Sequence, residues 1–132
     1  MNHWALYTAM QAVGESSGRP VFIGEATGKP ALPYAVLNAD WEPEPDVGQP
    51  LLLEPGAFRA SIQMNSYGRA NEDALWLDAV LYTVLMQRDQ VFPGVNVIWR
   101  EADDSPVLTR DDKGLILCKH WYRFVFYRTE EP

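Results

Sequence analysis

Two side chains near the carboxyl end of the sequence have the types and spacing that could support catalysis. Cys118 and His120 lie two positions apart, so a strand would place both on one face. A thiol beside an imidazole could act as nucleophile and base, but it would also need an orienting acid and an oxyanion hole. A tetrahedral metal site would need a second ligand pair, and the sequence holds no other cysteine and only one other histidine, His3. We therefore expect a core thiol and a half-buried imidazole, with no metal and no cofactor.

Two pairs of aspartates flank a short segment, 105–110, that we expect to connect two strands. Paired carboxylates could bind a hard cation such as calcium. The sequence lacks the calcium-loop pattern with its glycine and terminal glutamate, so turn-forming aspartates in solvent are the favoured interpretation. A small metal-dependent enzyme remains an alternative function, and it would use Asp103, Asp104, Asp111 and His120.

Two glycine-containing segments match known catalytic or phosphate-binding motifs only in part. Segment 24–30 reads GEATGKP, with three residues between the glycines where a phosphate loop has four. Pro30 stands where that loop would have a hydroxyl to bind magnesium. Segment 14–18 reads GESSG, but it follows a predicted helix, whereas a nucleophile elbow follows a strand. With these motifs incomplete, we predict that the protein is not an enzyme.

Length and charge limit the remaining possibilities. The chain has 132 residues, of which 47% are hydrophobic and 22% are charged, as expected for one globular domain spanning 1–132. Its net charge of −7 makes it a poor candidate for gripping nucleic acid, because that affinity comes from lysine and arginine. No apolar run approaches the ~20 residues of a membrane span, so we expect no membrane partner.

Hydrophobic periodicity predicts an α+β fold. Apolar residues at helical spacing predict a short helix over 2–13 and a long helix over 71–88, capped by Asn71. Alternating or apolar runs bounded by proline and glycine predict strands over 20–23, 33–39, 58–67, 95–100 and 115–128. We therefore expect a mostly antiparallel or mixed sheet of about four to five strands, packed by one long and one short helix.

Residues 41–56 differ from the rest of the chain. They contain four prolines, two glycines and four acids, a composition that forbids a helix or a central strand. We interpret this segment as an extended proline-rich arm. Its apolar residues would need a surface to lie on; they are Trp41, Leu51, Leu52 and Leu53.

The long predicted helix is more apolar than one sheet requires. Its apolar arc is about 220°, whereas ~100° suffices for a surface helix. Trp76 and Val80 also interrupt its remaining polar strip. The excess predicts either a subunit interface or coverage by the first helix and the arm. The predicted interface residues are Trp76, Val80, Trp41, Leu51, Leu52, Leu53, Trp121 and Tyr127.

The order of these elements resembles the tail completion (tail terminator) proteins of long-tailed phages. The resemblance extends from about Ala5 to Tyr127 and is carried best by two stretches. One is Ile62–Glu72, IQMNSYGRANE, where a predicted strand turns into the long helix; the other is the closing YRFVF at 122–126. The chain departs from the family in its arm, which is longer than the family pattern.

The resemblance implies a virion protein that forms a homohexamer ring in the viral neck. Such a ring ends the tail tube, joins it to a head-side connector or stopper protein, and lets DNA pass without specific binding. The implied partners are other copies of the chain, the tail tube protein and the head-side protein. The implied setting is late assembly in the host cytoplasm, with head-tail joining as the role. Another neck ring, a head completion or stopper protein, is the nearest alternative.

Overall fold

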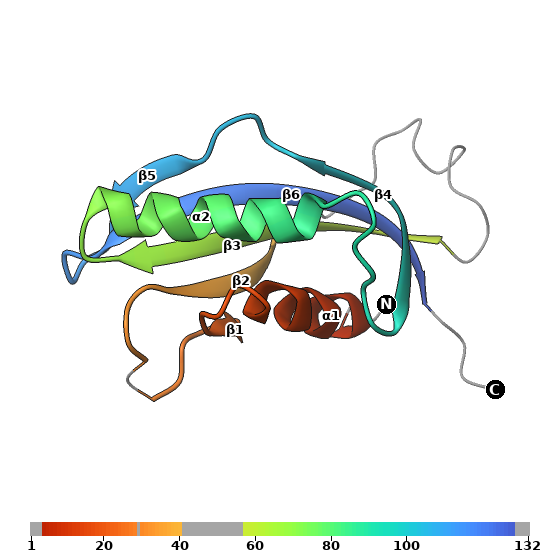
Figure 1. Ribbon diagram of the computed structural model, residues 1–132, viewed down its shortest axis with the longest axis horizontal. Helices are drawn as coiled ribbons and strands as arrows, with labels where there is room; N and C mark the ends of the chain where they lie inside the picture. The colour runs from red at the N-terminus through yellow and green to blue at the C-terminus, as the bar shows by residue number, and fades with distance from the viewer. Residues whose placement is uncertain (1–3, 29, 41–56, 129–132) are drawn as a thin grey trace.

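The computed structural model describes residues 4–28, 30–40 and 57–128, and the predicted arm at 41–56 lies outside this part of the chain. Within these described ranges, two helices and six strands form a mixed α+β fold, which confirms the predicted class (Figure 1). In chain order they are α1 (Trp4–Glu15), β1 (Val21–Ile23), β2 (Tyr34–Asp40), β3 (Ala57–Gly68), α2 (Asn71–Met86), β4 (Val95–Ala102), β5 (Val107–Arg110) and β6 (Ile116–Arg128).

The sheet is built around its two longest strands. The strand order is β1-β2-β3-β6-β4, and β5 pairs with β6 beside β4. Among the strand pairs of the described residues, only β1 with β2 is parallel. The strand that the sequence patterns did not predict is β5, which lies inside the segment 105–110 that was predicted to be a connection. All four of its residues are exposed. Because neither side of β5 is buried, its sequence shows no alternation of apolar and polar side chains, and that alternation is the pattern from which a strand is predicted.

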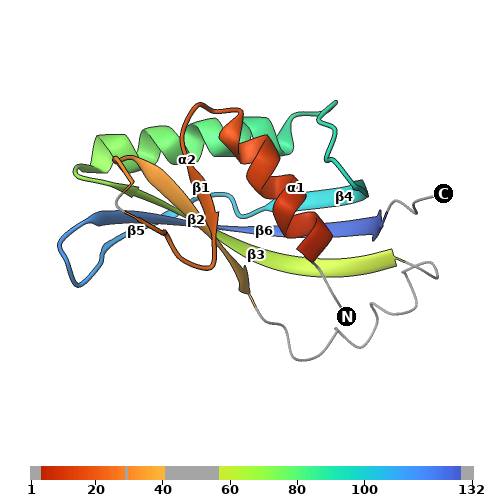
Figure 2. The same cartoon turned by 90° about the horizontal axis from the view of Figure 1, so that it is seen from below.

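Both helices cover the same face of the sheet (Figure 2). Alternate residues of β3 and β6 point toward them, as the period of two requires. The largest fully buried side chains are the β6 aromatics Tyr122, Phe124 and Phe126. Leu6 and Met10 of α1 and Leu77, Leu81 and Leu85 of α2 complete this core. The opposite face of the sheet has no helix on it among the described residues.

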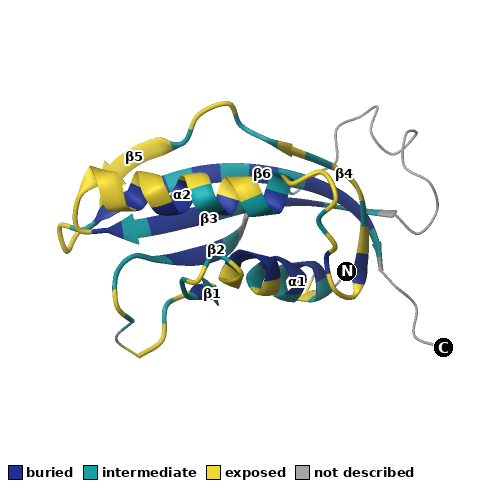
Figure 3. Ribbon diagram, in the orientation of Figure 1, coloured by how far each residue is buried: buried dark blue, intermediate teal, exposed yellow. Residues whose placement is uncertain are grey.

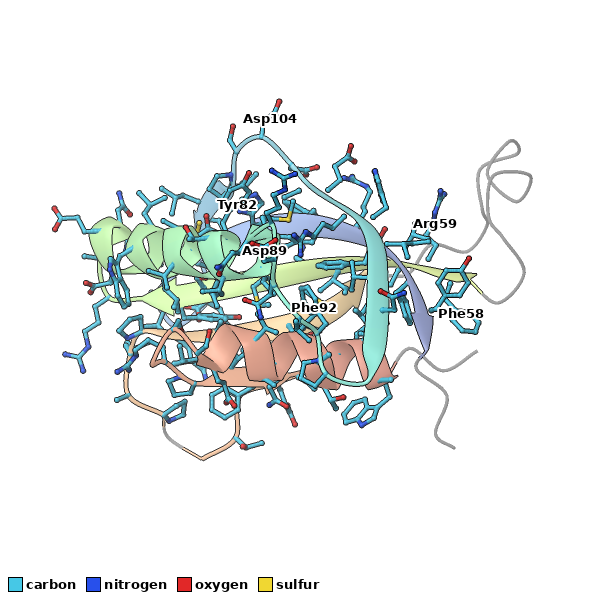
Figure 4. The ribbon with its side chains drawn as sticks, turned by 45° about the vertical axis from the view of Figure 1, so that its right-hand side comes forward. Phe58, Arg59, Tyr82, Asp89, Phe92 and Asp104 are labelled. Atoms are coloured by element: carbon cyan, nitrogen blue, oxygen red, sulfur yellow. The ribbon has the colours of Figure 1, made fainter. Side chains whose placement is uncertain are left out.

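The connection from α2 to β4 is anchored by an aromatic side chain that sequence patterns did not single out. Phe92 is buried and meets Phe124 edge-on, with ring centroids 5.7 Å apart. Figure 4 shows it pointing into the space between α1 and the sheet. The Arg100 guanidinium lies over its ring, 5.9 Å from the centroid, and donates a hydrogen bond to the Gln87 carbonyl. This anchor fixes where the chain leaves the long helix.

The helix boundaries correct three sequence expectations. Asn71 was predicted to cap the long helix, but it is the first helical residue. Ala70 holds the cap position in extended backbone (φ −131°, ψ 161°) and makes no side-chain cap bond. The helix also ends at Met86 rather than at 88, because the backbone of Gln87 (φ −59°, ψ 132°) has already left the helical region. The short helix extends to Glu15, beyond the predicted end at Val13, and the predicted start at residue 2 lies outside the described residues.

Candidate functional site

The outward side of α2 carries exposed apolar side chains. Leu75, Trp76 and Tyr82 are 39%, 50% and 43% exposed, and Val80 is half-buried between the two sides of the helix. Figure 3 shows the exposed bands on this helix alternating with its buried stripe. We call these four residues the outer helix surface. It contains both residues that the sequence predicted on this helix as interface residues, and half of the Trp76 surface remains exposed.

A second aromatic surface lies on the sheet face away from the helices. Odd-numbered residues of β6 point there, since the even-numbered ones form the core. Trp121 and Tyr127, both predicted interface residues, are half-buried on this face. The register adds Tyr34 and Tyr67, whose rings stack 5.1 Å apart, and the 46%-exposed Trp99. We call these five residues the aromatic sheet surface; it and the outer helix surface lie on opposite sides of the molecule.

The remaining predicted interface residues cannot be placed on either surface. They are Trp41, Leu51, Leu52 and Leu53, and all four lie outside the described residues. The four predicted interface residues that the structure describes thus lie in two groups, one on each surface.

Sequence reasoning missed a buried ionic cluster between α2 and β6. Asp78 and His120 are 5% and 3% exposed, and the Nδ1 atom of His120 lies 3.0 and 3.1 Å from the two carboxylate oxygens of Asp78. The Nε2 atom of His120 lies 2.9 Å from the backbone carbonyl of Asp103. The Tyr82 ring stacks on the imidazole, with centroids 5.6 Å apart. A signal was present: Asp78 interrupts the apolar stripe of α2, and a charge in such a position needs a buried partner.

The surroundings of His120 act on its charge in opposite directions. Burial alone lowers the pKa of His120, because it disfavours the charged form. The hydrogen bonds to Asp78 and to the Asp103 carbonyl, together with the negative charges of Asp78 and Asp103, outweigh burial and raise this pKa above its ordinary value. The cluster therefore favours the imidazolium form.

The same geometry argues against a Cys118–His120 nucleophile pair. Asp78 supplies the orienting acid that the sequence could not reveal, but the Nε2 atom of His120 faces the Asp103 carbonyl instead of a thiol. Burial, followed by the negative charge of Asp78, raises the pKa of Cys118 to about 12. A thiol with this pKa is almost entirely protonated near neutral pH, so Cys118 is a poor nucleophile.

We expect the folded protein to resist alkylation at Cys118. Its thiolate fraction at pH 8 is smaller by roughly a thousandfold than that of an ordinary cysteine, because its pKa lies near 12 instead of 9.0. Burial adds to this protection. Mass spectrometry after iodoacetamide treatment measures the rate, with Thr109→Cys in a Cys118→Ala background as the exposed control. Rapid single-site labelling of the folded chain at Cys118 would contradict the assignment.

The residues of the metal-dependent alternative do not form a ligand set. The Asp111 carboxylate accepts the backbone N–H groups of Lys113 and Leu115 at 2.9 and 2.8 Å, which confirms its turn role. The Asp103 carboxylate accepts a hydrogen bond from Arg123 at 3.0 Å. Asp104 is exposed and points away from the molecule (Figure 4). Within the ranges that the structure describes, no group of three or more histidine, cysteine or acidic side chains is placed to hold a metal ion.

Two further findings bear on the class of protein. Neither described helix combines the length and apolar character needed to cross a membrane. Comparison with known proteins gave no matching family model and no matching curated protein.

Proposed function

We propose that this protein is a structural ring subunit of a phage virion neck, which terminates the tail tube and joins it to the head connector. The observation that supports it best is the pair of surfaces with aromatic side chains, the outer helix surface and the aromatic sheet surface, on opposite sides of the molecule. Together with the resemblance of the element order and of the Ile62–Glu72 stretch, this favours a protein that assembles with copies of itself.

A closed ring requires contacts of this kind. Each subunit must offer two different patches, one to each neighbour, because head-to-tail contacts generate rings and self-complementary contacts generate dimers. The outer helix surface and the aromatic sheet surface are two such patches. Both are rich in tryptophan and tyrosine, which dominate the binding energy of protein interfaces. Trp76 and Trp121 are the central residues that we assign to the two patches.

The charge of the chain fits a passage for DNA. A chain of this length has a radius of gyration of about 14 Å, so one copy cannot encircle a duplex and several are needed. The net charge of −7 would repel phosphates from a pore wall built of these subunits. This repulsion reaches ~8 Å at physiological salt. DNA would therefore slide through without being held.

Electron microscopy of the purified protein mixed with tail tubes tests this proposal. We expect rings that cap one end of each tube. Cross-linking then identifies the neighbour: products with tail tube protein support a terminator, whereas products with portal-side proteins alone support a head completion or stopper ring. A protein that is strictly monomeric by light scattering and leaves tube ends bare would overturn the proposal.

The double variant Trp76→Ala with Val80→Ser is expected to fold but to assemble poorly. These side chains lie beside the buried stripe of α2, so their loss leaves the core intact. Loss of one hot-spot tryptophan costs about 2 kcal/mol or more of association energy, equivalent to roughly a 30-fold weaker contact. Light scattering reports assembly and circular dichroism reports folding.

The matched control for this prediction is Val91→Ala. Val91 is 75% exposed in the connection after α2, away from both surfaces, and its loss should change neither measurement. If the double variant unfolds, its residues are part of the core and the interface assignment is wrong.

A further inference from the structure

We propose that His120 is a charged imidazolium at neutral pH that fastens the β4–β5 connection, residues 103–106, to the body of the protein, and that loss of its proton releases this connection. The inference rests on the hydrogen-bond geometry of the buried cluster. It does not depend on the proposed neck function. Tyr82 is the one residue that the cluster shares with the outer helix surface, and the cluster shares none with the aromatic sheet surface.

Both ring nitrogens of His120 face acceptors. Nδ1 lies 3.0 Å from a carboxylate oxygen of Asp78, and Nε2 lies 2.9 Å from the Asp103 carbonyl oxygen. A neutral imidazole has one N–H donor and one lone pair, so in either tautomer it would place a lone pair against an oxygen. Beside an ionised Asp78 carboxylate, only the doubly protonated ring donates to both partners. The other arrangement with these contacts is a protonated Asp78 that donates to Nδ1 of a neutral ring, and the NMR experiment below distinguishes the two.

Among the groups that face the His120 ring from α2, β6 and β3, the Asp78 carboxylate is the one that favours the imidazolium, and the others are neutral. From α2 come the Asp78 carboxylate and the Tyr82 ring. On β6 the neighbours Cys118 and Tyr122 stay neutral, because burial raises the pKa of both. Met64, the uncharged register partner of His120, lies opposite on β3.

The β4–β5 connection also packs against His120, and its Asp103 brings a second carboxylate near the ring. This carboxylate is paired with Arg123. The Asp103 carboxylate lies 3.0 Å from Arg123, which also approaches Glu101 at 3.5 Å. Arg123 therefore balances the negative charges of Asp103 and Glu101, and the imidazolium of His120 balances the negative charge of the buried Asp78. The cluster is an ion pair that spans 42 positions of sequence.

Removal of the proton changes one contact more than the other. The remaining N–H stays with Asp78, because hydrogen bonds to a charged acceptor are stronger than those to a neutral carbonyl. The Nε2 lone pair then faces the Asp103 carbonyl, which has lost its donor. The connection keeps the hydrogen bond from the Asp103 N–H to the Trp121 carbonyl, at 3.1 Å, and the contact with Arg123. We therefore expect local loosening of residues 103–106 while the sheet stays paired.

Nitrogen-15 NMR of the full chain tests the protonation state directly. The sequence has two histidines, so His3→Gln leaves His120 as the single imidazole signal. We expect both ring nitrogens to carry a proton at pH 7 and to lose one only above the ordinary histidine range. A neutral ring with one tautomer at pH 7 would overturn the proposal outright.

Hydrogen exchange across the same pH range tests the release. Protection of the Asp103 amide, which donates to the Trp121 carbonyl at 3.1 Å, should fall by about tenfold or more as the ring loses its proton, because the loosened connection opens more often. Amides of β3 serve as the internal reference and should keep their protection. Unchanged protection of the connection through the titration would show that the histidine does not fasten it.

Two variants separate the charge from the packing of the cluster. Asp78→Asn removes the buried negative charge, so the ring should lose its proton at lower pH and the connection should loosen with it. Tyr82→Phe keeps the stacked ring without its hydroxyl and should leave the titration unchanged. If Asp78→Asn fails to fold, the titration of the His3→Gln protein still decides the question.

Discussion

The variant Asp78→Ala is expected to lose ~3–5 kcal/mol of unfolding free energy, the usual cost of removing one partner of a buried ion pair. Its carboxylate is the acceptor for the imidazole of His120, and the side chains of both residues are less than a tenth exposed. Without it, the buried imidazole is left without a partner at Nδ1. Chemical denaturation at pH 6, with the unfolding midpoint and slope recorded, measures the loss.

The double variant Asp78→Leu with His120→Leu is the control for this prediction. Replacing both members of a buried pair with apolar side chains is often nearly neutral, so the pair together should cost less than Asp78→Ala alone. A loss below about 1 kcal/mol for Asp78→Ala would show that the two groups are not coupled in the folded state.

The same pair sets how stability depends on pH. Because the folded state raises the pKa of His120, its contribution is fully present below pH ~6.5, the ordinary value for unfolded chains. It is lost as the pH rises through the higher pKa of the folded state. This term should therefore make the wild type less stable as the solution becomes more alkaline, and His120→Gln should flatten this part of the profile.

The variant Gly68→Ala is expected to cost roughly 1–3 kcal/mol, because it adds a methyl group where the chain has no room. A Cβ atom at this position would lie 2.7 Å from the Cβ of Asp73 and 2.8 Å from the backbone nitrogen of Ala74. The second contact is with the first turn of α2, which cannot move without shifting the helix. Thermal and chemical unfolding of the variant measure the cost.

The neighbouring substitution Arg69→Ala is the matched control for the glycine variant. Arg69 is exposed, so its loss should change stability by no more than about 0.5 kcal/mol. A glycine variant as stable as this control would mean that the helix can move away from β3 at little cost. The close approach at Gly68 would then have no structural role.

Local sequence patterns predicted most of the elements because each depends on residues a few positions apart. Alternation along β3 assigned its core face, as the burial of Ile62 and Met64 confirms, whereas β6 is apolar on both faces and its alternation did not decide between them. Helical spacing likewise identified the buried stripe of α2, including Leu77 and Leu81. The assignment of Trp76 and Trp121 to subunit contacts stays a prediction, since it concerns surfaces and not elements.

The features that the sequence could not reveal are those made by distant segments. The register of β3 with β6 and the packing of α2 across them bring Asp78 to His120. Gly68 appeared to be a simple strand ending, and only the approach of the first turn of α2 explains why a glycine stands there. Periodicity records which face of an element is buried, whereas the identity of the partner on that face depends on how the elements pack. The sequence by itself therefore determined the elements and their apolar faces, and the tertiary structure alone decided the ion pair and the close contact.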